Sequence, residues 1–140
     1  IINFFFIIIS VLITLIFCES VLRFKHSIIP NYDIEMWKYA KKLKIKSDNP
    51  KVGHTHIKNK SANLQKVNIS INNYGQRDID INNNILNKYD RSFLVLGSSI
   101  ALGWGVSNDE TFSYVLNKIS QSKNKRWLFI NGGVGNYSIA

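Results

Sequence analysis

The sequence predicts an α/β fold: the start of a flavodoxin-like, three-layer α/β/α parallel sheet, preceded by a transmembrane helix. Two apolar runs, residues 93–96 and 127–130, each end in a glycine-rich turn, as strands buried in a parallel sheet do. Between them lies a segment with the apolar period of a helix. The uncharged run at residues 1–18 has the length of a membrane span.

Only Asn3, Ser10 and Thr14 interrupt the Ile, Leu, Phe and Val residues of this first run. Its eighteen residues span about 27 Å as a helix, close to the thickness of a bilayer's hydrocarbon core. Glu19 and Arg23 follow, four residues apart, so we predict that they pair at the membrane interface. We therefore predict one transmembrane helix over residues 1–24.

A cleaved signal peptide is the alternative for this segment. The apolar region of such a peptide is about 7–15 residues long and precedes a small-residue cleavage site. Phe17, Cys18 and Glu19 do not supply that site. A lipid on Cys18 is a second alternative, which the bulky Phe17 disfavours because a bacterial lipobox has a small residue there. The single cysteine also excludes an internal disulfide and a cysteine-based zinc site.

The 140 residues allow one small domain, and a hydrophobic content of 45% excludes a disordered chain. Because the chain starts at Ile rather than Met, we expect it to be a piece of a longer protein. The net charge of +9 is concentrated in residues 23–66, which hold 11 basic and 3 acidic residues. This segment could bind anionic lipid or acidic polysaccharide, or form an ordinary solvated surface. Nucleic acid is disfavoured because this segment sits beside a membrane anchor.

Residues 25–66 are predicted as a basic juxtamembrane linker with one short amphipathic helix. Pro30 and Asn31 should end the first helix, and Asp33 should cap the next one, which runs to about Leu43. We expect its apolar side to carry Ile34, Trp37, Ala40 and Leu43, or Tyr39, opposite three lysines. Residues 47–60 are predicted to be a loop with two solvated histidines, His54 and His56, and no metal site.

Residues 67–140 are predicted to form the globular part. Val67, Ile69 and Ile71 alternate with polar residues, which indicates a half-buried strand. Asp109 or Ser107 should cap a helix that carries Phe112, Val115, Leu116 and Ile119 on one face. Strand, helix and strand predict a right-handed parallel crossover, with ligands bound at the carboxyl ends of the strands.

Three short motifs lie where such a site is expected. The first apolar run leads into Gly97-Ser98-Ser99 with Gly103 and Gly105 behind it, and the second leads into Asn131-Gly132-Gly133-Val134-Gly135-Asn136-Tyr137-Ser138. Upstream stands Asn72-Asn73-Tyr74-Gly75-Gln76-Arg77-Asp78. In this order the motifs resemble the SGNH/GDSL hydrolase superfamily over residues 72–140. The apolar helix and residues 33–37 look like the preface of members associated with surface polysaccharides.

The resemblance implies that Ser99 is the nucleophile, rather than Ser98 or Ser138. It implies an oxyanion hole made of backbone N–H groups from Ser99 and from Gly133 or the Gly135–Asn136 step. Gly97, Ser98, Gly103 and Gly105 would support the turn, with Ser98 in place of the family's usual Asp and Asn136 at a usual glycine position. The family's catalytic base would lie beyond Ala140, as would the oxyanion-hole asparagine after the third strand, so we expect residues 1–140 alone to be inactive.

The predicted function is that of a membrane-anchored serine hydrolase or acyl-transfer enzyme. Its implied substrate is an acylated small molecule or polysaccharide, and it needs no cofactor. The lipid bilayer is the other expected partner, and the globular part should lie outside the cytoplasm. One alternative is a catalytically silent binding or assembly protein of the same fold, motivated by Ser98 and Asn136. Another is a phosphate-binding loop at residues 97–105, although no nucleotide-binding glycine motif is matched there.

Overall fold

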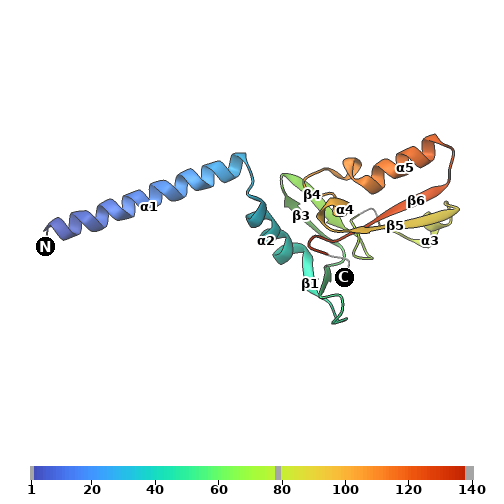
Figure 1. The fold of residues 1–140 in the computed structure, drawn as a ribbon, viewed down its shortest axis with the longest axis horizontal. Helices are drawn as coiled ribbons and strands as arrows, with labels where there is room; N and C mark the ends of the chain where they lie inside the picture. Colours follow the sequence, from blue (N-terminus) through green and yellow to red (C-terminus); the bar gives the residue numbers. More distant parts are fainter. Residues whose placement is uncertain (1, 78–79, 138–140) are drawn as a thin grey trace. The chain divides into compact units, whose positions relative to one another are not determined.

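The structure, a computed structural model, describes residues 2–77 and 80–137 and comprises two units, Ile1–Ile34 and Glu35–Ala140. The first unit is mainly the helix α1 (Ile2–Ile28), drawn in blue in Figure 1. Its stretch Phe4–Ile28 contains an 18-residue window with a mean hydropathy of 2.6 and is long and apolar enough to cross a membrane. The predicted helix is confirmed, and it continues four residues past position 24. The predicted pair also forms, with Arg23 Nε 2.7 Å from Glu19 Oε1.

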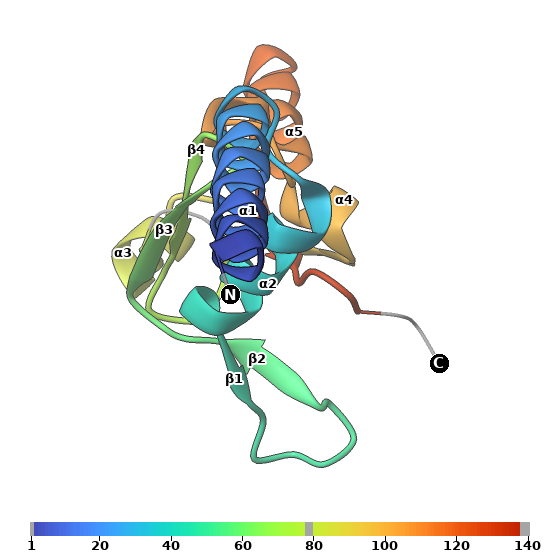
Figure 2. The ribbon, with the colours of Figure 1, turned by 90° about the vertical axis from the view of Figure 1, so that its left-hand side faces the viewer.

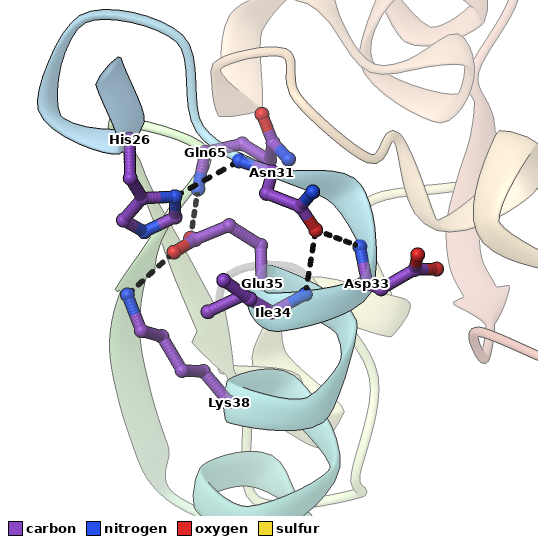
Figure 3. Close-up of polar contacts among 7 residues, drawn as sticks. All are labelled: His26, Asn31, Asp33, Ile34, Glu35, Lys38 and Gln65. Carbon is purple, nitrogen blue, oxygen red and sulfur yellow. Dashed lines mark hydrogen bonds and ion pairs between the residues drawn. The ribbon is translucent and has the colours of Figure 1, made fainter. Parts of the chain in front are cut away.

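The helix α2 (Tyr32–Leu43) begins with a cap different from the predicted one. The Asn31 side-chain oxygen accepts hydrogen bonds from the backbone N–H groups of Asp33 (3.0 Å) and Ile34 (3.1 Å), as Figure 3 shows. The prediction of Asp33 as the cap was therefore wrong. Asn31 takes this role because its carboxamide lies just before the first free N–H groups of the helix.

The buried side of α2 matches the predicted one only at Leu43 and Tyr39. It consists of Glu35, Met36, Tyr39 and Leu43, whereas Ile34, Trp37 and Ala40 are exposed. Two of the buried residues are polar, and both have partners. Glu35 accepts hydrogen bonds from Lys38 Nζ (2.7 Å) and from the backbone N–H of Gln65 (2.8 Å), drawn in Figure 3. These polar contacts, which hydrophobic periodicity cannot reveal, turn the helix away from its predicted face.

Two antiparallel hairpins follow α2, and Figure 2 shows both. The strand β1 (Lys44–Lys46) pairs with β2 (His54–His56), so the segment predicted as a loop contains a strand, and His56 is buried. The strand β3 (Lys60–Leu64) pairs with β4 (Val67–Ile71). The predicted strand over residues 67–71 is confirmed, with Ile69 and Ile71 facing the core.

The main core joins α2, the β3–β4 hairpin and the short helix α4 (Ser99–Leu102). Its buried members are Met36, Tyr39, Leu43, Ala62, Leu64, Ile69, Ile71 and Leu102. Five of these eight come from the segment that the sequence marks as a basic linker. A smaller cluster of Ile81, Leu128 and Ile130 packs near the helix α3 (Asn83–Leu86). Residues 35–66 therefore help to build the unit that carries the candidate site.

The strands β5 (Arg91–Gly97) and β6 (Trp127–Gly133) form the predicted parallel pair, in register from Arg91 opposite Trp127 to Gly97 opposite Gly133. Between them lie α4, the 3₁₀ helix η1 (Asn108–Glu110) and the helix α5 (Phe112–Ser122), as Figure 1 shows. The α/β class is thus confirmed. Each sheet of the described residues has two strands. The prediction that β5 is buried on both faces was wrong, since Leu94 and Leu96 are 51% and 70% exposed.

The helix α5 has its own N-cap, Thr111, whose hydroxyl accepts from the backbone N–H of Tyr114, while Ser107 and Glu110 cap η1. Its predicted apolar face is largely exposed at Phe112, Val115 and Ile119. The helix instead turns polar side chains toward β6. Asn117 donates to the carbonyl of Phe129 (2.9 Å) and accepts from the N–H of the same residue (2.7 Å). Its carboxamide thus satisfies backbone groups that β6 does not pair within the sheet.

Candidate functional site

Ser99 lies where the sequence predicts, just past the carboxyl end of β5. The strand ends at Gly97, and the carbonyl of Ser98 accepts the first helical hydrogen bond, from the N–H of Leu102 at 2.9 Å. Ser99 is therefore the first residue of α4. Its hydroxyl has no hydrogen-bond partner within residues 2–77 and 80–137. The hydroxyl of Ser98 does not cap α4, so Ser98 contributes to the turn through its backbone.

The turn after Ser99 needs glycine at Gly103. Gly103 ends α4 with φ +80°, and a Cβ there would lie 2.8 Å from the Thr111 side chain. The chain then folds back, because the N–H of Trp104 donates to the carbonyl of Ser99 at 2.9 Å. Gly105 follows, also with positive φ. A pocket of about 380 Å³ opens beside this turn, lined by Ser99, Ile100, Gly103, Trp104, Val106 and Glu110.

The buried side chain of Arg77 donates hydrogen bonds to the backbone of this turn. Its side chain is only 2% exposed. Nη1 donates to the carbonyls of Leu102 (3.0 Å) and Gly103, and Nη2 donates to the carbonyl of Val106 at 2.7 Å. Nε donates to Asn108 Oδ1 at 3.0 Å. A guanidinium suits this role because its planar fork offers several donors at once.

The segment that carries Arg77 is itself a tight turn. The buried side chain of Asn72 accepts hydrogen bonds from the N–H groups of Tyr74 (2.9 Å) and Gln76 (3.0 Å). Asn72 thus replaces a backbone partner for two N–H groups, as asparagine does in turns. Asp78, the last residue of the predicted motif, lies outside the described residues.

We call residues 97–105 the first glycine loop and residues 131–136 the second. The second lies against the first, since the N–H of Val134 donates to the carbonyl of Gly97 at 3.0 Å. Gly133 permits this approach, because a Cβ there would collide with the backbone of Ala101 and Leu102. The structure thus brings together the two loops that the sequence predicts as neighbours. Ser138, in the same predicted motif, lies outside the described residues.

The predicted oxyanion-hole donors differ in their availability. The N–H of Gly133 donates to Asn131 Oδ1 (3.0 Å), and the N–H of Gly135 donates to the Tyr39 hydroxyl (3.0 Å). Asn136 has φ +64°, a left-handed conformation that asparagine tolerates. Among the residues that the structure describes, the N–H groups of Ser99 and Asn136 have no acceptor. These two are the predicted donors that a ligand oxygen could use without displacing another bond.

A buried series of hydrogen bonds connects the second glycine loop to α2 and β2. Tyr39 accepts from the N–H of Gly135, and its hydroxyl lies 2.6 Å from His56 Nε2. His56 Nδ1 lies 2.9 Å from the carbonyl of Gly75, which can only accept. His56 is therefore protonated on Nδ1, and Tyr39 donates to Nε2. The series runs from the second glycine loop to the turn that bears Arg77.

Charged and polar groups surround this series of hydrogen bonds. Lys44 Nζ donates to the carbonyl of Gly135 (2.5 Å) and lies 3.0 Å from His54 Nε2, which is also 3.3 Å from that carbonyl. The Tyr137 hydroxyl donates to the carbonyl of His54. Burial lowers the pKa of Lys44. Burial is also the main cause that lowers the pKa of His56, with Lys44 and His54 adding to it and the bond to Gly75 opposing it. Burial raises the pKa of Tyr39.

The histidines have partners other than Ser99. His56 uses both ring nitrogens in the series just described, and His54 faces Lys44. His26, in the first unit, accepts from the N–H of Asn31 at 3.0 Å. Within the described part of the chain, no histidine is hydrogen-bonded to the Ser99 hydroxyl.

The sequence did not predict Tyr39, Lys44, His54 or His56 as part of this site. The one available signal was the alternation of His54, Thr55 and His56, which places both rings on one side of a strand. Comparison with protein-family models, with curated proteins and with solved structures finds no match for this chain.

Proposed function

We propose that this chain is part of a membrane-anchored serine hydrolase or acyl transferase of the SGNH/GDSL type, acting on O-acyl esters. Acylated polysaccharides or small acylated molecules are the proposed substrates. The supporting observation is the position of Ser99, whose unbonded hydroxyl lies at the carboxyl end of a parallel strand, beside a pocket and the second glycine loop. We also propose that β5 and β6 begin a flavodoxin-like sheet.

In this proposal Ser99 Oγ attacks the carbonyl carbon of the ester. The serine proton passes to a base, and the carbonyl oxygen becomes an oxyanion. The N–H groups of Ser99 and Asn136 would donate to that oxygen. The alcohol then leaves with a proton, and water or an acceptor hydroxyl attacks the acyl-serine to free Ser99. Arg77 and Tyr39 would position the two loops without touching the substrate.

A fluorophosphonate probe tests the proposal on the protein as expressed from its own gene. We expect one covalent adduct, assigned to Ser99 by mass spectrometry of the digest. Ser99→Ala should abolish the adduct. Ser98→Ala is the matched control and should keep it, since the Ser98 hydroxyl does not cap α4. An adduct on Ser98 or Ser138 would overturn the assignment of the nucleophile.

A catalytically silent binding or assembly protein is the second candidate function. The observation that favours it is the departure from the family pattern at Ser98 and Asn136. Under this alternative the protein would carry no probe adduct but would bind an acylated glycan at the same pocket. Binding abolished by Trp104→Ala, in a protein that the probe does not label, would favour this alternative over the enzyme.

A further inference from the structure

The outward side of α2 carries an exposed tryptophan next to exposed lysines. Trp37 is 62% exposed, and Lys41 Nζ lies 5.0 Å from the centre of its ring. Lys42, the next residue of the helix, is exposed as well. We call these three residues the α2 outer face. Glu35, Met36, Tyr39 and Leu43 are buried on the opposite side of the helix, so Trp37 takes no part in the core of this unit.

An indole exposed on a helix costs free energy in water, and it gains at the boundary between water and lipid. There the ring contacts the upper acyl chains while its N–H group stays hydrated. Lysine fits the same depth, because its apolar stem lies along the lipid and its ammonium reaches the headgroups. Trp37 and Lys41, in contact on one helix face, combine both properties.

The chain length keeps this face near a bilayer. The membrane-length helix ends at Ile28, and Trp37 follows nine residues later. Nine residues reach at most about 30 Å when fully extended. If α1 spans a membrane, Trp37 stays within that distance of the point where α1 leaves it, whatever the arrangement of the two units.

The positive charge of residues 35–66 favours contact with anionic lipids. Residues 35–66 contain 9 lysines and 2 acidic residues. One of the two acids, Glu35, is buried and paired with Lys38. Seven of the lysines are exposed, including Lys41 and Lys42. A surface of this charge next to a membrane is attracted to anionic headgroups.

We propose that the α2 outer face docks on the surface of an anionic membrane, with the Trp37 ring at the level of the headgroups and upper acyl chains. Lys41 and Lys42 pair with lipid phosphates there. This contact holds the compact unit against the bilayer as a second anchor after α1. The proposal does not depend on the chemistry at Ser99.

Tryptophan quenching in the full chain tests this contact. The protein is reconstituted in vesicles of phosphatidylcholine and phosphatidylglycerol, with and without phosphatidylcholine brominated near the top of its acyl chains. We expect the brominated lipid to quench part of the emission. Trp37→Phe should remove that part, whereas Trp127→Phe, at a half-buried tryptophan in β6, should keep it.

Two further arms separate lipid charge from other causes. Lys41→Gln/Lys42→Gln should reduce the quenching in phosphatidylglycerol vesicles, whereas Lys58→Gln/Lys60→Gln, which removes the same charge elsewhere, should reduce it less. Added salt should weaken the contact, since it screens exposed charges. All substituted side chains except Trp127 are exposed, so circular dichroism should show unchanged folding for these variants. Quenching that Trp37→Phe leaves intact would overturn the proposal. A change in Trp37 emission that a soluble acidic polysaccharide causes and lipid does not would also overturn it.

Discussion

Arg77 shows how one buried side chain can organise a candidate site from a distance. Its guanidinium satisfies three carbonyls in the turn that follows Ser99, together with the side chain of Asn108. Loss of the guanidinium would remove a donor from each of these carbonyls. The carbonyls of Leu102 and Gly103 would keep one other donor each, from Asn131 Nδ2 and the N–H of Val106. The carbonyl of Val106 would lose its Arg77 donor, and an unsatisfied acceptor costs more than the bond itself contributes. Arg77 therefore stabilises the turn after Ser99, whether or not Ser99 is a nucleophile.

We predict that Arg77→Met lowers the free energy of unfolding by about 3 kcal/mol, and Arg77→Lys by about half as much, because lysine keeps a charge and fewer donors. Urea denaturation of the full chain in detergent, followed by near-ultraviolet circular dichroism, measures both. Arg126→Met is the control. Arg126 is 61% exposed with its ion pair to Asp90, so its replacement should cost no more than about 0.5 kcal/mol. Equal losses at the two arginines would contradict the role assigned to Arg77.

At the scale of elements, α2 and α5 follow the same rule, and both expose most of the residues on their predicted apolar face. Each buries a side that includes polar residues, because those residues satisfy groups elsewhere in the chain. In α2 the Tyr39 hydroxyl serves Gly135 and His56. In α5, Asn117 serves the backbone of Phe129. Apolar periodicity reports transfer from water and takes no account of such bonds, so by itself it does not locate the whole buried face.

The hydrogen-bond chain through β2 predicts a pH effect on stability. The folded protein holds His56 neutral with a pKa below its ordinary value of 6.5, so the unfolded chain binds a proton first as the pH falls. Stability should therefore decrease from about pH 7 downward until the pH reaches the folded pKa, and stay level below it as far as this group is concerned.

Thermal or urea denaturation at a series of pH values, between about pH 7 and pH 5, measures this slope. His56→Gln should remove the part of the slope that comes from His56. His54→Gln, in the same strand, is the matched control and should retain it. An identical pH dependence in wild type and His56→Gln would show that the chain through Tyr39 and Gly75 is not the cause.

For the whole molecule, no histidine among the residues that the structure describes is hydrogen-bonded to the serine of the candidate site. The described histidines are engaged with Tyr39, Gly75, Lys44 and Asn31. The parallel pair β5–β6 also exposes Leu94 and Leu96, although parallel sheets are normally covered on both faces.

We predict that this chain, purified in detergent, hydrolyses p-nitrophenyl acetate no faster than its Ser99→Ala variant. Without a base within hydrogen-bond reach, the serine keeps its proton and only a residual rate remains. The initial rate of p-nitrophenol release measures this. A rate that depends on Ser99 and also disappears in His54→Ala or His56→Ala would show that one of these histidines moves to act as the base.

The arrangement across the membrane gives a further prediction. We expect the unit Glu35–Ala140 outside the cytoplasm, even though its basic start favours the inside, because the positive-inside rule weakens for long translocated segments. Alkaline phosphatase fused after residue 140 should be active, and a cytoplasmic reporter fused at the same point should be inactive. The reverse pair of results would invert the topology.

The sequence by itself determined the membrane-length helix, the strand over residues 67–71, the parallel pair β5–β6 and the position of Ser99 at a strand end. These features depend on neighbours in the chain: uncharged length, alternation, and a glycine after an apolar run. Only the tertiary structure decided which faces of α2 and α5 are buried, that His56 lies in the core, and that Gly133 and Gly135 already use their N–H groups. The bond between Tyr39 and Gly135 joins residues 96 positions apart. No local pattern encodes such a contact, because it forms only when the hairpins and glycine loops fold around a shared core.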